Sequence, residues 1–63
     1  MNFKENLKTT RRNKGFTQEI LAKKIEVSKF TIQKYEQGNR EPNLEQLERI
    51  KIALGCLWED LLG

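Results

Sequence analysis

The stretch TQEILAKKIEVSKFTIQKYEQG, residues 17–38, contains the signals for two consecutive helices and a very short connection. Thr17 and Ser28 are residue types whose side chains accept a hydrogen bond from the first turn of a helix. The apolar positions recur three or four residues apart within each half, which is helical periodicity: Leu21 and Ile25, then Ile32 and Tyr35. We therefore predict helices over residues 17–25 and 28–37, arranged as a helix-turn-helix.

The outer face of the second helix has a composition suited to DNA. At 100° per residue, Phe30 falls opposite the apolar face, among lysines and glutamines. A B-DNA major groove admits one α-helix, in which Gln33 can bond adenine, Lys29 guanine and Phe30 the thymine methyl group. Thr31 and Lys34 flank these residues and can reach bases or phosphates. The alternative for Phe30 is that it folds down onto the preceding helix.

Two further features lie around this pair of helices. Gln18 is just inside the start of its helix, where free N–H groups and a side-chain amide suit a phosphate. Arg11 and Glu36 are near the ends of their helices, and if these ends meet, the two side chains can form a bidentate pair that holds Arg11 ready for a phosphate. The alternative is two solvated charges.

Outward from this stretch, the same signals predict three more helices. Their expected bounds are residues 2–14, 43–54 and 57–62, with Asn2 and Asn43 as N-caps. β-type alternation is absent. The expected fold class is all-α, a compact five-helix bundle forming one domain over residues 1–63.

Composition restricts the function. The 63 residues include one cysteine and no histidine, so no internal disulfide and no zinc site can be argued. No nucleophile–base pair or phosphate-binding glycine loop is present, so we expect no enzyme activity and no cofactor. No apolar run approaches a membrane span, and we expect a cytoplasmic protein with no small-molecule ligand.

Charge divides the chain into two parts. Residues 1–40 contain ten Lys or Arg and four Glu, a net charge of +6, whereas residues 41–63 contain two basic and five acidic residues, a net charge of −3. The basic part suits a polyanion, and the acidic part is expected to face elsewhere.

Residues 11–55 resemble the Cro/Xre-type helix-turn-helix family, to which phage repressors belong. The resemblance rests on a series of residues at matching spacing: Arg11, Gly15, Thr17, Gln18, Leu21, Ala22, Ile25, Val27, Ser28, Ile32, Tyr35, Glu36, Gly38, Arg40, Pro42, Leu44, Leu47, Ala53, Leu54 and Gly55. It implies base contacts from Lys29, Phe30 and Gln33, and phosphate contacts that include Asn39 and Arg40.

The resemblance also implies a homodimer bound to operator DNA, completed on the DNA if the free dimer is weak. We expect the dimer contact in the apolar C-terminal helix, at Leu57, Trp58, Leu61 and Leu62. The expected function is a sequence-specific transcriptional regulator, a repressor at a near-palindromic operator. The alternative is an antitoxin-like or adaptor module that uses the same fold to bind protein.

Four positions depart from the family pattern. Glu26 stands where the turn usually has glycine, and a left-handed glutamate there costs on the order of 1 kcal/mol. Thr10 and Lys51 replace residues that are often apolar, which predicts a thinner core. Leu57 replaces a Ser or Thr cap, so we expect the last helix to fray.

Overall fold

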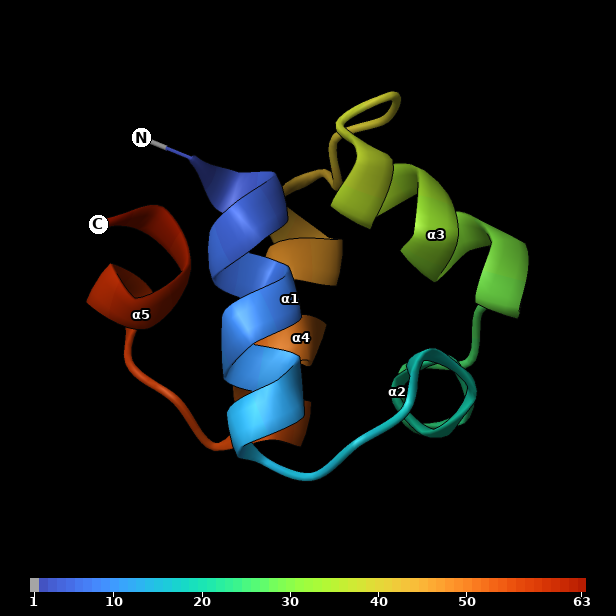
Figure 1. Cartoon of the computed structure of the whole chain (residues 1–63), viewed down its shortest axis with the longest axis horizontal. Coiled ribbons are helices and arrows are strands. Elements are labelled where there is room, and N and C mark those ends of the chain that lie inside the picture. The colour runs from blue at the N-terminus through green and yellow to red at the C-terminus, as the bar shows by residue number, and fades with distance from the viewer. Residues whose placement is uncertain (1) are drawn as a thin grey trace.

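Helix starts and stops in the sequence determine the architecture. The computed structural model describes residues 2–63 and contains five helices: α1 (Phe3–Asn13), α2 (Gln18–Lys24), α3 (Lys29–Gln37), α4 (Leu44–Leu54) and α5 (Trp58–Leu62). The described residues include no strand, which confirms the all-α, five-helix prediction. In Figure 1, α1 runs through the middle of the molecule, with α4 behind it, α5 on one side and α2 and α3 on the other.

The predicted N-caps are confirmed. Thr17 Oγ1 accepts from the Ile20 N–H and Ser28 Oγ from the Thr31 N–H, at 3.0 and 3.1 Å. The Asn2 and Asn43 side chains make the equivalent bonds in α1 and α4. Because each cap satisfies one N–H that has no partner within its helix, these side chains fix where the helices begin.

Helix α5 begins without a Ser or Thr cap, and Asp60 in its first turn accepts a hydrogen bond there instead. Asp60 Oδ2 accepts a hydrogen bond from the Leu57 N–H at 2.9 Å. The carboxylate also lies in the first helical turn, where negative charge is favourable. The expected weak start of this helix is therefore stabilised from within the helix.

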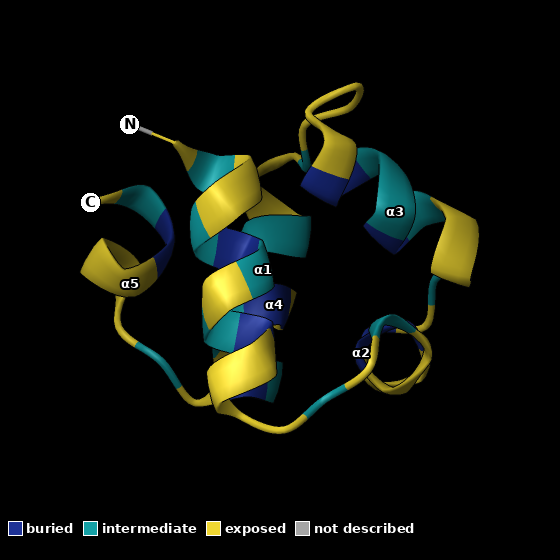
Figure 2. Cartoon of the chain, in the orientation of Figure 1, coloured by how far each residue is buried: buried dark blue, intermediate teal, exposed yellow. Residues whose placement is uncertain are grey.

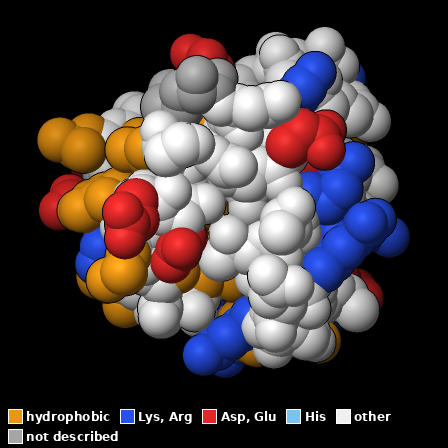
Figure 3. All heavy atoms as spheres, turned by 60° about the vertical axis from the view of Figure 1, so that its left-hand side comes forward, with side chains coloured by type: hydrophobic (Ala, Val, Ile, Leu, Met, Phe, Trp, Pro, Cys, Tyr) orange, Lys and Arg blue, Asp and Glu red, His pale blue; other side chains and the backbone are white. Residues whose placement is uncertain are grey.

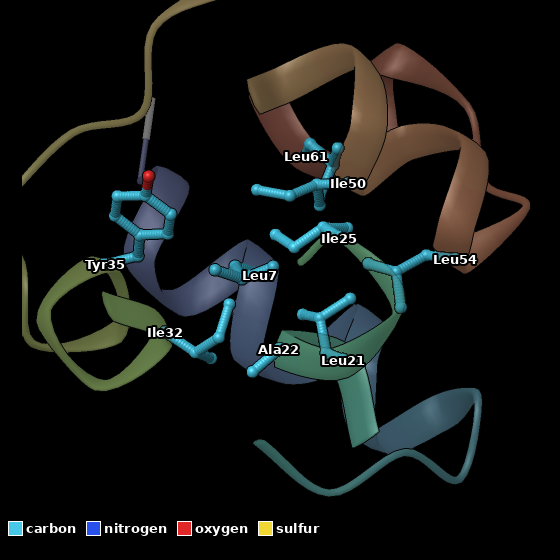
Figure 4. Packing of buried hydrophobic residues seen from close by; sticks show 9 residues of the cluster. All are labelled: Leu7, Leu21, Ala22, Ile25, Ile32, Tyr35, Ile50, Leu54 and Leu61. Carbon is cyan, nitrogen blue, oxygen red and sulfur yellow. The ribbon is translucent and has the colours of Figure 1, made fainter. Parts of the chain in front are cut away.

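The core contains residues from all five helices. Its nine buried members are Leu7, Leu21, Ala22, Ile25, Ile32, Tyr35, Ile50, Leu54 and Leu61. Figure 4 shows their side chains converging between α1, α2, α3 and the C-terminal helices. Figure 2 shows the same pattern on the ribbon, where each helix is buried along one side.

Polar side chains of α1 fasten α5 to the bundle. Asn6 Nδ2 donates to the carbonyl oxygens of Leu61 and Gly63, at 3.0 and 3.2 Å. Thr10 Oγ1 donates to the Asp60 carbonyl at 3.4 Å. The hydroxyl at position 10 thus forms part of the contact between α1 and α5.

Candidate nucleic-acid interface

Helices α2 and α3 form the predicted helix-turn-helix. In Figure 1, α2 is seen end-on while α3 is seen from the side, running across the view, so the two meet at a steep angle. Ala22 is 2% exposed and brings no long side chain between them. The turn closes when the Val27 N–H donates to the Ala22 carbonyl at 2.9 Å. Glu26 adopts a left-handed conformation with φ of 60°, as the turn requires.

The two faces of α3 differ sharply. Ile32, Tyr35 and Glu36 are buried, whereas Lys29 and Phe30 are exposed. The Phe30 side chain is 60% exposed, and the Lys34 ammonium lies 4.9 Å from the centre of its ring. The alternative that Phe30 packs down onto α2 is therefore wrong. The ring stays at the surface, accompanied by a cation at a distance typical of a cation–π contact.

The other predicted contact residues of α3 are less exposed than Phe30 and less buried than Ile32. Thr31, Gln33 and Lys34 are half-buried. The Thr31 hydroxyl lies 3.1 Å from Ser28 Oγ, so it belongs to the cap of α3 as well as to its outer side. Gln33 has no comparable role in the cap and remains the better candidate for a bidentate base contact.

A buried polar network connects α1, α2 and α3. Arg11 Nε donates to Glu36 Oε2 at 2.6 Å, and Arg11 Nη2 donates to Glu36 Oε1 at 3.1 Å. Arg11 Nη1 donates to the Phe16 carbonyl at 2.7 Å, and Gln18 Nε2 donates to Glu36 Oε1 at 3.1 Å. The predicted bidentate pair is thus present, but it is buried rather than at the surface.

This burial changes the expected role of Arg11. Only 8% of its side chain and 2% of the Glu36 side chain are exposed. The Arg11 guanidinium donates to Glu36 and Phe16 inside the protein, and Arg11 also borders the hollow beside Gln18, so its direct phosphate contact stays a prediction. Its contribution is to hold Glu36, which in turn holds Gln18.

The surface around Gln18 is hollow. The hollow lies where α1 ends and α2 and α3 begin, and its lining includes Arg11, Arg12, Gln18, Glu19 and Lys29. Arg12 and Lys29 are exposed cations beside the Gln18 amide, and together they outnumber the exposed Glu19 carboxylate, so a phosphate can enter this space. Arg12 was not predicted from the sequence as a contact residue, although its place beside Arg11 in the last turn of α1 was the available signal.

Asn39 and Arg40 lie in the loop that follows α3. Both are exposed, and the Asn39 N–H donates to the Lys34 carbonyl at 3.0 Å, which closes the end of the helix. Gly38 permits this ending because its φ is 78°, a left-handed value. The loop is therefore anchored directly to α3 and leaves both side chains at the surface.

Comparison with known proteins agrees with this geometry. A family model described as helix-turn-helix matches residues 7–61. The chain belongs to this helix-turn-helix family, of the Cro/Xre type. A relative from Enterococcus faecalis, the HTH-type transcriptional activator BcrR, is 39% identical over all 63 residues. The chain spans 31% of the length of that relative. These matches support a DNA-binding domain of a transcription regulator.

The C-terminal helix and its N-cap contain the four apolar residues predicted to form the dimer contact, and their exposure differs. Leu57 is 60% exposed and Trp58 is 38% exposed, with the Lys51 ammonium 5.6 Å from the Trp58 ring. Leu62 is half-buried and packs against the core. Leu61 does not fit the predicted dimer contact, because its side chain is fully buried in the core and cannot reach a second copy.

Two exposed apolar residues of α4 were not predicted from the sequence. Ile52 is 78% exposed, and Leu44, whose spacing predicted a place in the core, is 68% exposed. Ile52 is two residues from both Ile50 and Leu54, the buried positions of α4, and this spacing, which places it on the opposite face, was the available signal. On the left of Figure 3, hydrophobic and acidic side chains lie side by side, whereas lysines and arginines form a band on the right.

Residues 2–63 show little chemistry of other kinds. They include no group of three or more His, Cys, Asp or Glu side chains placed to hold a metal ion. Partial burial and the nearby Asp60 carboxylate raise the pKa of the Cys56 thiol, which therefore stays neutral at physiological pH.

None of the helices in residues 2–63 has the length and apolar character needed to cross a membrane.

Proposed function

We propose that this domain binds operator DNA by inserting α3 into the major groove. The observation that carries the proposal is the exposed Phe30, 60% accessible and flanked by Lys29 and Lys34 on a helix whose other face is buried. Water solvates a phenyl ring poorly, whereas a groove edge with thymine methyl groups offers it an apolar partner. Lys29 and Gln33 supply the polar contacts to neighbouring bases.

Phosphate contacts surround this helix in the proposed complex. Gln18 and Arg12 lie on the α1–α2 side, while Lys34, Asn39 and Arg40 belong to α3 and the loop after it. Gln18 reaches the phosphate with an amide whose direction is fixed by Glu36. Since phosphate contacts position a protein and base contacts specify the sequence, the two groups have separable effects.

The experiment that tests the proposal is selection of bound duplexes from a random DNA pool, followed by mobility-shift titration. The expected result is one enriched half-site whose log affinity falls with log salt by about 0.9 for each phosphate neutralised by a cation. An affinity independent of salt contradicts the phosphate contacts. Absence of a shift on any DNA at low salt favours the adaptor alternative.

The finer proposal is a homodimer on a near-palindromic operator. A two-fold dimer places two copies of α3 about 34 Å apart, one turn of DNA. Leu57 and Trp58 supply the contact, because they are exposed apolar residues in the acidic segment, which is repelled by DNA. Sedimentation with a palindromic duplex tests this: two domains per duplex are expected, and a saturated one-to-one complex contradicts the dimer.

Repression is the proposed direction of regulation. A domain bound across a promoter excludes polymerase without any further contact. The similar E. faecalis protein is named an activator, which is the alternative direction. A reporter with the selected operator placed over or upstream of the promoter separates the two outcomes. Activation from the upstream position, with no repression from the overlapping one, contradicts the proposal.

A further inference from the structure

Phe30 and Lys34 form a pair on the outer side of α3, one helical turn apart. The Lys34 ammonium lies 4.9 Å from the centre of the Phe30 ring. A cation at this distance is attracted to the ring face and limits the directions that the ring can take. With 60% of its side chain exposed, the ring still leaves surface free for a partner.

The ring can sense only part of what a base pair presents. A phenyl group has no hydrogen-bond donor or acceptor, so it cannot distinguish the O4 acceptor of thymine from the N4 donor of cytosine. It can distinguish a pyrimidine with a C5 methyl group from one without, since the methyl group projects into the major groove as an apolar surface. The same methyl group is present in 5-methylcytosine.

We propose that Phe30 makes DNA binding depend on the C5 methyl group of one pyrimidine, so that thymine and 5-methylcytosine are accepted where uracil and cytosine are disfavoured. The inference rests on the proposed function of α3. Its consequence is a domain whose affinity responds to cytosine methylation at that position. Lys34 contributes by holding the ring in place.

The test uses the duplex obtained from selection, with each thymine replaced in turn by deoxyuridine. One position in each half-site is expected to lose about fourfold in affinity, which corresponds to about 0.8 kcal/mol for one buried methyl group. At that position, a pair with 5-methylcytosine is expected to bind about fourfold more tightly than a pair with cytosine. In Phe30→Ala, the ratio of affinities for thymine and uracil and the ratio for 5-methylcytosine and cytosine are both expected to fall to about one.

Ile52→Ala is the matched control. It truncates another exposed apolar residue, on α4, and is expected to keep both ratios. Thermal unfolding followed by circular dichroism confirms that each variant is folded.

Binding with no methyl-dependent position, or a dependence that persists in Phe30→Ala, overturns this inference and leaves the proposed function intact. Failure of the wild-type domain to bind any duplex contradicts both.

Discussion

The α2–α3 side and the α4–α5 side of the domain differ in the kinds of side chain that they bury and expose. On the first, the charged side chains of Arg11 and Glu36 are buried and hydrogen-bonded to each other, and the neutral Gln18 amide donates to Glu36. On the second, the fully buried side chains Ile50, Leu54 and Leu61 are apolar, and the exposed surface includes the apolar residues Leu57 and Trp58. A surface that contacts DNA needs side chains held in fixed directions, and the hydrogen-bonded network holds Gln18 in this way. A surface that contacts a second protein chain needs apolar area more than direction.

The largest expected effect is a loss of stability when the buried ion pair of the α2–α3 side is broken. Glu36→Ala leaves the Arg11 guanidinium buried without its carboxylate, because only 8% of that side chain is exposed. Removing one partner of a buried ion pair costs about 3–5 kcal/mol. We expect the free energy of unfolding, measured by urea denaturation, to fall by that amount, which is a large part of the stability of so small a domain.

The control is the other ion pair of the described residues. Arg49 and Glu45 lie one turn apart on α4, with Arg49 Nη2 3.3 Å from Glu45 Oε2. Their side chains are 45% and 73% exposed. Glu45→Ala is expected to cost no more than about 0.5 kcal/mol, since exposed pairs contribute little. Equal losses for Glu36→Ala and Glu45→Ala would falsify the structural role assigned to the buried network.

The second prediction concerns the outer face of α3. Gln33→Ala is expected to weaken binding to the selected site by about 1–3 kcal/mol and to leave binding to random DNA nearly unchanged. The reason is that a bidentate base contact discriminates between sequences, whereas phosphate contacts do not. Fluorescence anisotropy with both duplexes measures the two affinities.

Lys23→Ala, at an exposed position of α2, provides the comparison for Gln33→Ala. Its effect on the two duplexes is expected to be the same. A loss for Gln33→Ala that is equally large on random DNA shows that this side chain contacts no base.

The sequence predicted the helices because their starts and stops are local. Thr17, Ser28 and the glycines act within one turn of chain, and every predicted boundary lies within one residue of the structure. The pairing of Arg11 with Glu36 was accessible as a hypothesis because both lie at helix ends. Its burial and the third partner, Gln18, were not, since they depend on how three helices pack.

The same limit explains the failures at the C-terminal end. Leu57, Trp58, Leu61 and Leu62 have similar hydrophobicity, and their sequence does not tell which of them α1 covers. Only the packing of α5 against α1, fixed by Asn6 and Thr10, separates the buried Leu61 from the exposed Leu57. The exposed face of α3 was easier to predict, because an amphipathic helix with one buried face has only one other face.

The third prediction examines the α4–α5 side. Trp58→Ala is expected to weaken binding to a palindromic duplex by about 1–2 kcal/mol, although Trp58 lies in the acidic segment and not on α3. On a duplex with a single half-site the loss is expected to vanish, because the second copy is then absent. Anisotropy titration of both duplexes measures the difference, and a loss of the same size on the single half-site contradicts a dimer contact.

The smallest expected effect compares one residue from each side in the same backbone conformation. Glu26, in the turn before α3, has φ of 60°, and Gly55, after α4, has φ of 61°. A left-handed conformation costs a residue with a Cβ about 1–2 kcal/mol, and glycine avoids this cost but has more freedom in the unfolded chain. Glu26→Gly is therefore expected to raise the free energy of unfolding by up to about 1 kcal/mol.

Gly55→Ala is the reciprocal change and is expected to lower the free energy of unfolding by about 1 kcal/mol. A Cβ at Gly55 meets only the Lys14 Nζ, at 3.5 Å, so the cost comes from the backbone and not from a clash. Urea denaturation of both variants measures the two shifts. If Glu26→Gly destabilises the domain while Gly55→Ala behaves as expected, the Glu26 side chain makes a stabilising contribution that exceeds its backbone strain.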